Sequence, residues 1–154
     1  LFEPLVAEPA PTRQDPEAVL IRNDFARKIK TKVYPQLSGV PGVSTGAVPL
    51  HETAIQSFEA ILDELEARGL LHLIESFAGS FVPRFIRGSD TTLSSHAYGT
   101  SVDINANENP QGSPPTDEQK QIAEVFAQHG WFWGDWFKPT RDPMHFEFIG
   151  RTSA

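Results

Sequence analysis

Two short segments in the second half of the chain contain the side chains best suited to metal chemistry. SSHAYGTSVDIN (94–105) offers His96 and Asp103, and DPMHFEF (142–148) offers His145 with Asp142 three residues before it. Two imidazoles and one carboxylate suit Zn²⁺, and three protein ligands leave a fourth position for water. A further carboxylate beside the last histidine would be the general base for that water. The sequence therefore predicts a hydrolytic site in which His96, Asp103 and His145 bind one Zn²⁺ per chain.

The spacing within the two segments determines how these side chains are presented. His96 and Asp103 are seven residues apart, and an odd separation places side chains on opposite faces of a straight strand. Gly99 lies between them and permits a bend, because glycine tolerates φ > 0. In SVDIN and HFEF, apolar residues alternate with Asp103, His145 and Glu147. We therefore expect two half-buried strands whose polar faces carry the site.

The remaining sequence supplies the elements that would hold these strands. Helical periodicity is clearest over residues 52–68, and it is also present over 16–33 and 116–128, where Thr116 and Gln119 form a capping box. Alternating or apolar runs predict strands, which are expected at 70–77, 80–86, 101–105, 131–137 and 144–150. Together these elements indicate an α+β fold, with a small antiparallel sheet that bears a zinc cleft and helices packed on the other face.

Composition favours a folded domain and excludes several kinds of site. The chain has 154 residues, 39% of them hydrophobic, which is enough for one domain with a buried core. The absence of cysteine excludes a thiolate metal site, and a formal net charge of −7 argues against a nucleic-acid partner. No run approaches the roughly 20 apolar residues that cross a bilayer, so we expect no membrane span in this chain. We also find no targeting signal in it.

The two segments resemble a family of zinc peptidases, the D-alanyl-D-alanine carboxypeptidases and L-alanyl-D-glutamate endopeptidases. The family signature is S-x-H-x-x-G-x-A-x-D followed by E/D-x-x-H, and the resemblance covers about residues 81–148. It implies the same scaffold, which the signalling domain of Hedgehog proteins shares. It also implies that His96, Asp103 and His145 are the zinc ligands and that Asp142 is the catalytic base.

This sequence departs from the signature at two positions. Ser101 replaces the alanine two residues before the metal-binding aspartate, which exchanges one small residue for another. Asp142 is one methylene shorter than the glutamate of many members, although the endopeptidase-like members also use aspartate. If Asp142 does not reach the water, Glu147 is the alternative base, because we expect it on the same strand face as His145.

The resemblance also suggests residues that contact the substrate. Arg84 and Arg87 lie where family members use an arginine to clamp a substrate carboxylate, a task that suits the planar guanidinium. Ser94 would bind the substrate or orient the loop, and Tyr98 would stabilise the oxyanion. Apart from the resemblance, Asp135 is a candidate acceptor for the second ring N–H of a zinc histidine, which metal-binding histidines usually donate. The ordinary alternatives are a surface arginine pair, a turn serine and a tyrosine that only covers the site.

By this resemblance the chain is a zinc metallopeptidase that hydrolyses a peptide bond in bacterial peptidoglycan stem peptides, or in similar short peptides with D-amino acids. The expected organisation is an extended arm or linker at 1–15, one zinc peptidase domain at 16–150 and a tail at 151–154. The expected location is the cell envelope or outside the cell. One alternative is a non-catalytic zinc-binding recognition module on the same scaffold, and another is a binding domain without metal.

Overall fold

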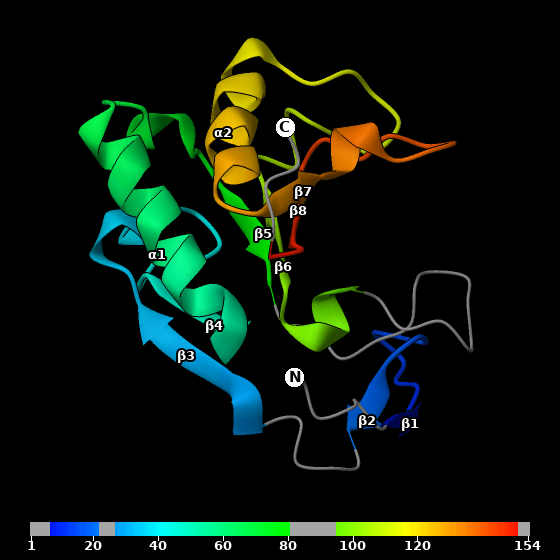
Figure 1. The fold of residues 1–154 in the computed structure, drawn as a ribbon. Helices are drawn as coiled ribbons and strands as arrows, with labels where there is room; N and C mark the ends of the chain where they lie inside the picture. Colours follow the sequence, from blue (N-terminus) through cyan, green and yellow to red (C-terminus); the bar gives the residue numbers. More distant parts are fainter. Residues whose placement is uncertain (1–6, 22–26, 81–94, 151–154) are drawn as a thin grey trace.

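Two α-helices and three small antiparallel sheets form the described part of the chain, which is residues 7–21, 27–80 and 95–150 of a computed structural model (Figure 1). The predicted α+β class is confirmed. The largest sheet has the strand order β5 (Phe77–Gly79), β6 (Ser101–Ile104), β8 (His145–Phe148) and β7 (Trp131–Trp133). Two smaller sheets pair β1 (Ala7–Pro9) with β2 (Val19–Ile21), and β3 (Ile29–Val33) with β4 (Ala47–His51).

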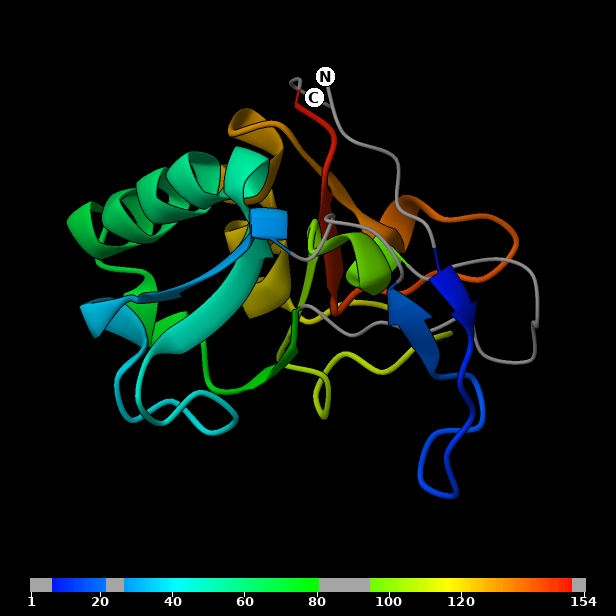
Figure 2. The same ribbon diagram turned by 90° about the horizontal axis from the view of Figure 1, so that it is seen from below.

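Both helices contribute to one hydrophobic core. α1 (Glu52–Ala67) and α2 (Asp117–Gln128) lie side by side, and their buried faces meet the inward side chains of the four-stranded sheet (Figure 1). The pair β1–β2 lies on the far side of the molecule from α1 (Figure 2). No helix in the described ranges has the length and apolarity needed to cross a membrane. In the four-stranded sheet, the completely buried core residues are Val102, Ile104, Trp131 and Phe146.

The helix predicted over residues 16–33 is wrong, because this range contains strands β2 and β3 and no α-helix among its described residues. In β3, Ile29 and Val33 alternate with Lys30 and Lys32, which is the two-residue period of a strand. All five residues of β3 pair in register with β4. β1, within the predicted N-terminal arm, pairs with β2 in the same antiparallel manner.

The strand predicted over residues 70–77 is wrong for most of its length. A 3₁₀ turn occupies Leu71–Leu73, and β5 begins only at Phe77. The backbone N–H groups of Glu75 and Ser76 donate to Oδ1 of Asn105, at 2.8 and 3.1 Å. A buried side chain therefore satisfies donors that a neighbouring strand would otherwise bind. Of the second predicted strand, residues 81–86 lie outside the described part of the chain.

The helices predicted over 52–68 and 116–128 are confirmed, but the capping box of the second is only half formed. Oγ1 of Thr116 accepts a hydrogen bond from the backbone N–H of Gln119 at 3.2 Å. The Gln119 side chain does not return to Thr116; it is buried, and its Nε2 donates to the carbonyls of Ile104 (2.9 Å) and Pro143 (3.0 Å). The N–H of Thr116 donates instead to Asn109. One side-chain amide of α2 thus binds the backbone of both predicted site segments.

Candidate metal centre

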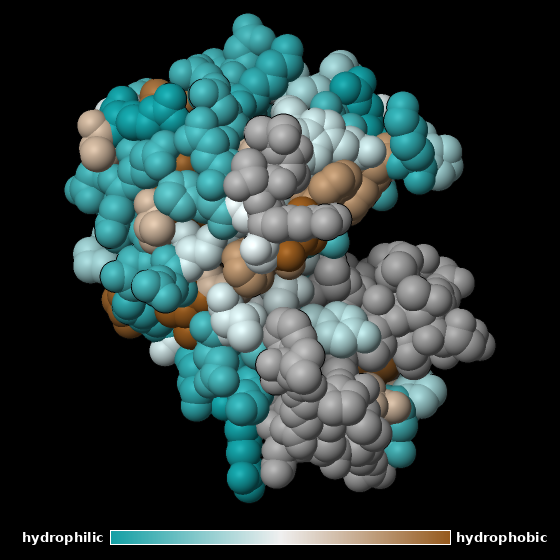
Figure 3. All heavy atoms as spheres, viewed as in Figure 1, coloured by the Kyte–Doolittle hydropathy of each residue, from teal (hydrophilic) through white to brown (hydrophobic). Residues whose placement is uncertain are grey.

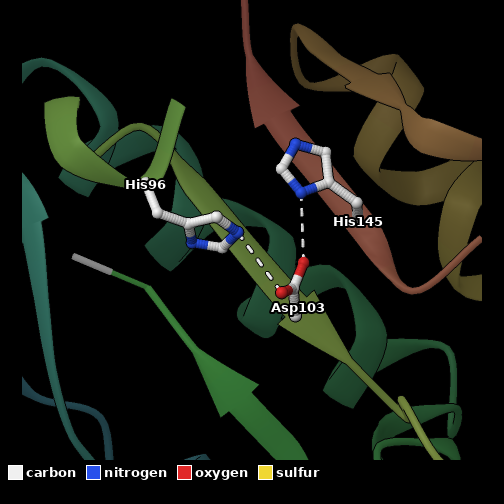
Figure 4. Close-up of side chains that lie close together, drawn as sticks. All are labelled: His96, Asp103 and His145. Carbon is white, nitrogen blue, oxygen red and sulfur yellow. Dashed lines mark hydrogen bonds and ion pairs between the residues drawn. The ribbon is translucent and has the colours of Figure 1, made fainter. Parts of the chain in front are cut away.

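Three separate elements bring the predicted ligands together. His96 lies on a 3₁₀ turn, Ser95–Tyr98, while Asp103 and His145 are direct cross-strand partners on β6 and β8. Figure 4 shows the two imidazoles converging on the Asp103 carboxylate, one from the turn and one from β8. Gly99 makes the bend between turn and strand with φ of 67°, and a Cβ there would lie 2.9 Å from the backbone nitrogen of His51 and 2.5 Å from a methyl of Ile29. The glycine predicted to separate His96 from Asp103 is therefore required by both conformation and space.

The carboxylate of Asp103 contacts both imidazoles, one with each oxygen. Its Oδ1 is 3.1 Å from Nδ1 of His145, and its Oδ2 is 3.3 Å from Nε2 of His96. One ligand atom from each of the three residues lies within 4.8 Å of the other two. Atoms bound at about 2 Å to one ion lie within about 4 Å of one another, so this donor set closes around Zn²⁺ with small side-chain movements. The residues present fit a zinc ion.

Each histidine binds a second acceptor through the ring nitrogen that faces away from Asp103. Nδ1 of His96 donates to the backbone carbonyl of Ser80 at 2.6 Å, and Nε2 of His145 donates to Oε1 of Glu147 at 2.9 Å. Such bonds fix the orientation and tautomer of metal-binding histidines. They direct Nε2 of His96 and Nδ1 of His145 into the centre of the cluster.

Within the cluster, His145 and Asp103 each shift the pKa of the other toward its charged form. Burial would lower the pKa of His145, but hydrogen bonds and charges from Asp103 and Glu147 raise it to about 9. Burial likewise opposes ionisation of Asp103, yet hydrogen bonds from His145 and His96 hold the pKa of its carboxyl well below the usual range. Asp103 is therefore an anion at neutral pH, which is the state that binds a metal ion.

Asp142, the predicted base, is held beside this cluster by its backbone. Its N–H donates to the carbonyl of Gly134 at 2.8 Å, and its own carbonyl accepts from the N–H of His145 at 3.0 Å. Gly134 permits this approach, because a Cβ there would collide with the Asp142 carbonyl and with Cβ of His145. Oδ1 of Asp142 is buried and has no hydrogen-bond partner in the described residues. Burial, with a contribution from the Asp103 charge, raises the pKa of the Asp142 carboxyl.

The structure corrects one predicted contact. Asp135 was expected to orient a zinc histidine, and this is wrong, because its carboxylate accepts two hydrogen bonds from Arg141 at 2.7 and 3.2 Å. The acceptors for the histidines are Glu147 and the carbonyl of Ser80 instead. A backbone carbonyl leaves no signal in the sequence, whereas the place of Glu147 two residues after His145 on a strand could have indicated its contact.

The other predicted site residues are less fully described. Tyr98 follows His96 on the same turn and has an exposed side chain. Ser101, at the position of the family's alanine, is completely buried, and its Oγ has no partner among the described residues. A small residue is therefore required there. Three predicted substrate contacts lie outside the described residues: Arg84, Arg87 and Ser94.

The segment between β7 and β8 carries both Asp142 and an exposed aromatic surface. Trp136 is 38% exposed and packs against Phe132 and Trp133, while the ring of Phe137 lies 5.5 Å from that of His145. The space-filling view shows hydrophobic atoms exposed beside this segment, whereas the surface over α1 and α2 is largely hydrophilic (Figure 3). Aromatic side chains therefore extend from the metal-ligand cluster toward the surface.

Comparison with known proteins finds a match between part of the chain and one family model. Residues 87–148 match the family model described as D-alanyl-D-alanine carboxypeptidase, and this range contains His96, Asp103, Asp142 and His145. No curated protein and no solved structure matches the chain. The match confirms the resemblance to the zinc peptidases and indicates a peptidase; it does not distinguish a carboxypeptidase from an endopeptidase.

Proposed function

We propose, from the match of residues 87–148 to the D-alanyl-D-alanine carboxypeptidase family, that this chain is a zinc-dependent metallopeptidase. Its substrates would be peptidoglycan stem peptides, cut as by a D-alanyl-D-alanine carboxypeptidase or an L-alanyl-D-glutamate endopeptidase. Such a substrate would place the protein in the cell envelope or outside the cell. The observation that carries this proposal is the buried His96–Asp103–His145 cluster with the carboxylate of Asp142 beside it.

The three clustered side chains would hold the metal through Nε2 of His96, the carboxylate of Asp103 and Nδ1 of His145. Bound zinc acts as a Lewis acid and lowers the pKa of water to roughly 7. Asp103 is already ionised, and its negative charge offsets part of the charge of the ion. The Ser80 carbonyl and the Glu147 carboxylate would keep the two rings from rotating out of position.

Asp142 would accept the proton of the attacking water and return it to the leaving amine. A general base works best when its pKa is close to the working pH, and burial moves the pKa of this carboxyl in that direction. Its buried Oδ1 has no hydrogen-bond partner in the described residues, so no described protein group uses the lone pairs of that atom. A non-catalytic recognition module would have no use for such a carboxylate, which is why the peptidase is preferred.

Zinc content and hydrolysis, measured on the same samples, test this proposal. Elemental analysis should find about one zinc per chain in the parent protein and in Asp142→Ala, and much less in Asp103→Ala. Only the parent should hydrolyse synthetic stem peptides that end in D-alanyl-D-alanine or contain an L-alanyl-D-glutamate bond. Zinc without hydrolysis of either peptide would favour the recognition module. A parent chain without zinc affinity would contradict the metal site itself.

A further inference from the structure

We propose that Glu147 is a positioning residue, which fixes the tautomer of His145 so that Nδ1 is the atom that binds the metal. The inference rests on the proposed zinc site and assigns a role that the family signature, which ends at the last histidine, does not give. Its basis is one contact: Oε1 of Glu147 lies 2.9 Å from Nε2 of His145.

Neutral imidazole carries a proton on one ring nitrogen and a lone pair on the other, so an acceptor at Nε2 leaves the lone pair on Nδ1. Nδ1 of His145 is the nitrogen that faces Asp103, at 3.1 Å. His96 has the opposite arrangement, because its Nδ1 donates to Ser80 and its Nε2 faces Asp103. The two histidines thus need different tautomers, and Glu147 is the side chain that determines one of them.

The strand geometry makes this contact specific. Glu147 and His145 are two residues apart on β8, so both side chains lie on the same face of the sheet. The register places Glu147 opposite Ser101 on β6 and Phe132 on β7, both uncharged. The His145 side chain is only 7% exposed, and the Glu147 side chain is 30% exposed. The carboxylate therefore covers the outer edge of the ring, and it faces away from the Asp103 side, where the metal would bind.

This arrangement also separates the roles of the two carboxylates near His145. A base must reach water on the Nδ1 side of the ring, where the ion would lie, whereas Glu147 is bound to the Nε2 side. Glu147 is therefore not the alternative base that its strand position suggested. Asp142 keeps that role, and Glu147 acts only through His145.

The test compares zinc affinity and ring tautomer in the full chain. Affinity is measured by competition with a chromophoric chelator, using zinc alone, for the parent, E147A, E147Q and a control variant. Glu108→Ala is the control, since it removes an exposed carboxylate from the loop after β6. Long-range ¹H–¹⁵N NMR spectra of the zinc-loaded proteins identify which nitrogen of His145 carries the proton.

E147A should bind zinc about 10 to 100 times more weakly than the parent, as is typical when the outer partner of a metal histidine is lost. E147Q should recover most of the loss, because its amide oxygen still accepts from Nε2, and Glu108→Ala should match the parent. The parent spectrum should show the proton on Nε2 of His145. A proton on Nδ1, or equal affinity in folded E147A and parent, would overturn the inference and leave the proposed peptidase intact. A parent chain that binds no zinc would overturn both.

Discussion

Substitution of Gln119 by leucine tests whether a buried amide holds the two halves of the site together. The Gln119 side chain is completely buried and makes three hydrogen bonds. Its Nε2 donates to the carbonyls of Ile104 and Pro143, and its Oε1 accepts from Nδ2 of Asn105 at 3.1 Å. Ile104 follows Asp103 in the chain, and Pro143 follows Asp142. Leucine would fill a similar volume and remove all three bonds.

The expected loss of stability depends on which hydrogen-bond partners of Gln119 keep another hydrogen bond after the substitution. The Pro143 carbonyl still accepts from Nε1 of Trp133 at 2.8 Å, and Nδ2 of Asn105 still donates to the carbonyl of Leu73 at 2.8 Å. A buried polar group that loses its partner costs about 1–3 kcal/mol, which applies to the Ile104 carbonyl, and the two groups that keep another partner each contribute less than about 1 kcal/mol. We expect Gln119→Leu to reduce the free energy of unfolding by about 2–4 kcal/mol.

The assay is urea denaturation of the zinc-free proteins, followed by tryptophan fluorescence. Gln121→Leu is the matched control, because Gln121 lies on the same helix with an exposed side chain, and the change there should alter stability by no more than about 0.5 kcal/mol. Equal stability of the two leucine variants would refute the reasoning. A large loss in Gln119→Leu with a normal value in the control would support it.

Three further substitutions or conditions give definite expectations. Gly134→Ala should reduce the free energy of unfolding by about 1–3 kcal/mol, because its methyl group collides with the Asp142 carbonyl. The same shift of Asp142 should slow hydrolysis, and an unchanged rate of hydrolysis would contradict this. Tyr34→Phe should be neutral or stabilising by about 1 kcal/mol in urea denaturation, because the Tyr34 hydroxyl is buried without a hydrogen-bond partner in the described residues; a loss of stability would contradict this. Zinc uptake at pH 7 to 8 should release a proton from His145, because Asp103 and Glu147 raise its pKa to about 9 despite burial. Zinc affinity should therefore rise with pH and level off near that pKa, and calorimetry in two buffers of different ionisation enthalpy that finds no proton release would contradict it.

The sequence was sufficient for the parts of the site that depend on local spacing. The alternation in SVDIN and HFEF predicts one polar face, and Asp103 and His145 are indeed cross-strand partners while Val102 and Phe146 are completely buried. The bend at Gly99 also follows from local sequence, because glycine adopts φ > 0 more readily than other residues, and Gly99 has φ of 67°. Local pattern therefore predicted how each segment presents its candidate ligands, whereas the resemblance to the zinc peptidases indicated that the two segments form one site.

Contacts between distant segments could not be predicted in this way. The run at 70–77 is apolar enough for a strand, but the Asn105 side chain binds its backbone N–H groups. Gln119 has the spacing of a capping residue, yet its amide finds two buried carbonyls from distant segments. In both cases a tertiary hydrogen bond overrides the local preference, because a buried polar group without a partner costs more than a change of local conformation.

The most direct test of the account is the turnover of a stem peptide by zinc-loaded parent protein and by Asp142→Asn at equal zinc content. The asparagine keeps the size of the side chain and removes its capacity to accept a proton. We predict a fall in kcat of about 10²- to 10⁴-fold, the usual contribution of a general base, with unchanged zinc binding. Equal turnover by the two proteins at matched zinc content would contradict Asp142 as the base, and absence of turnover in both would contradict the peptidase.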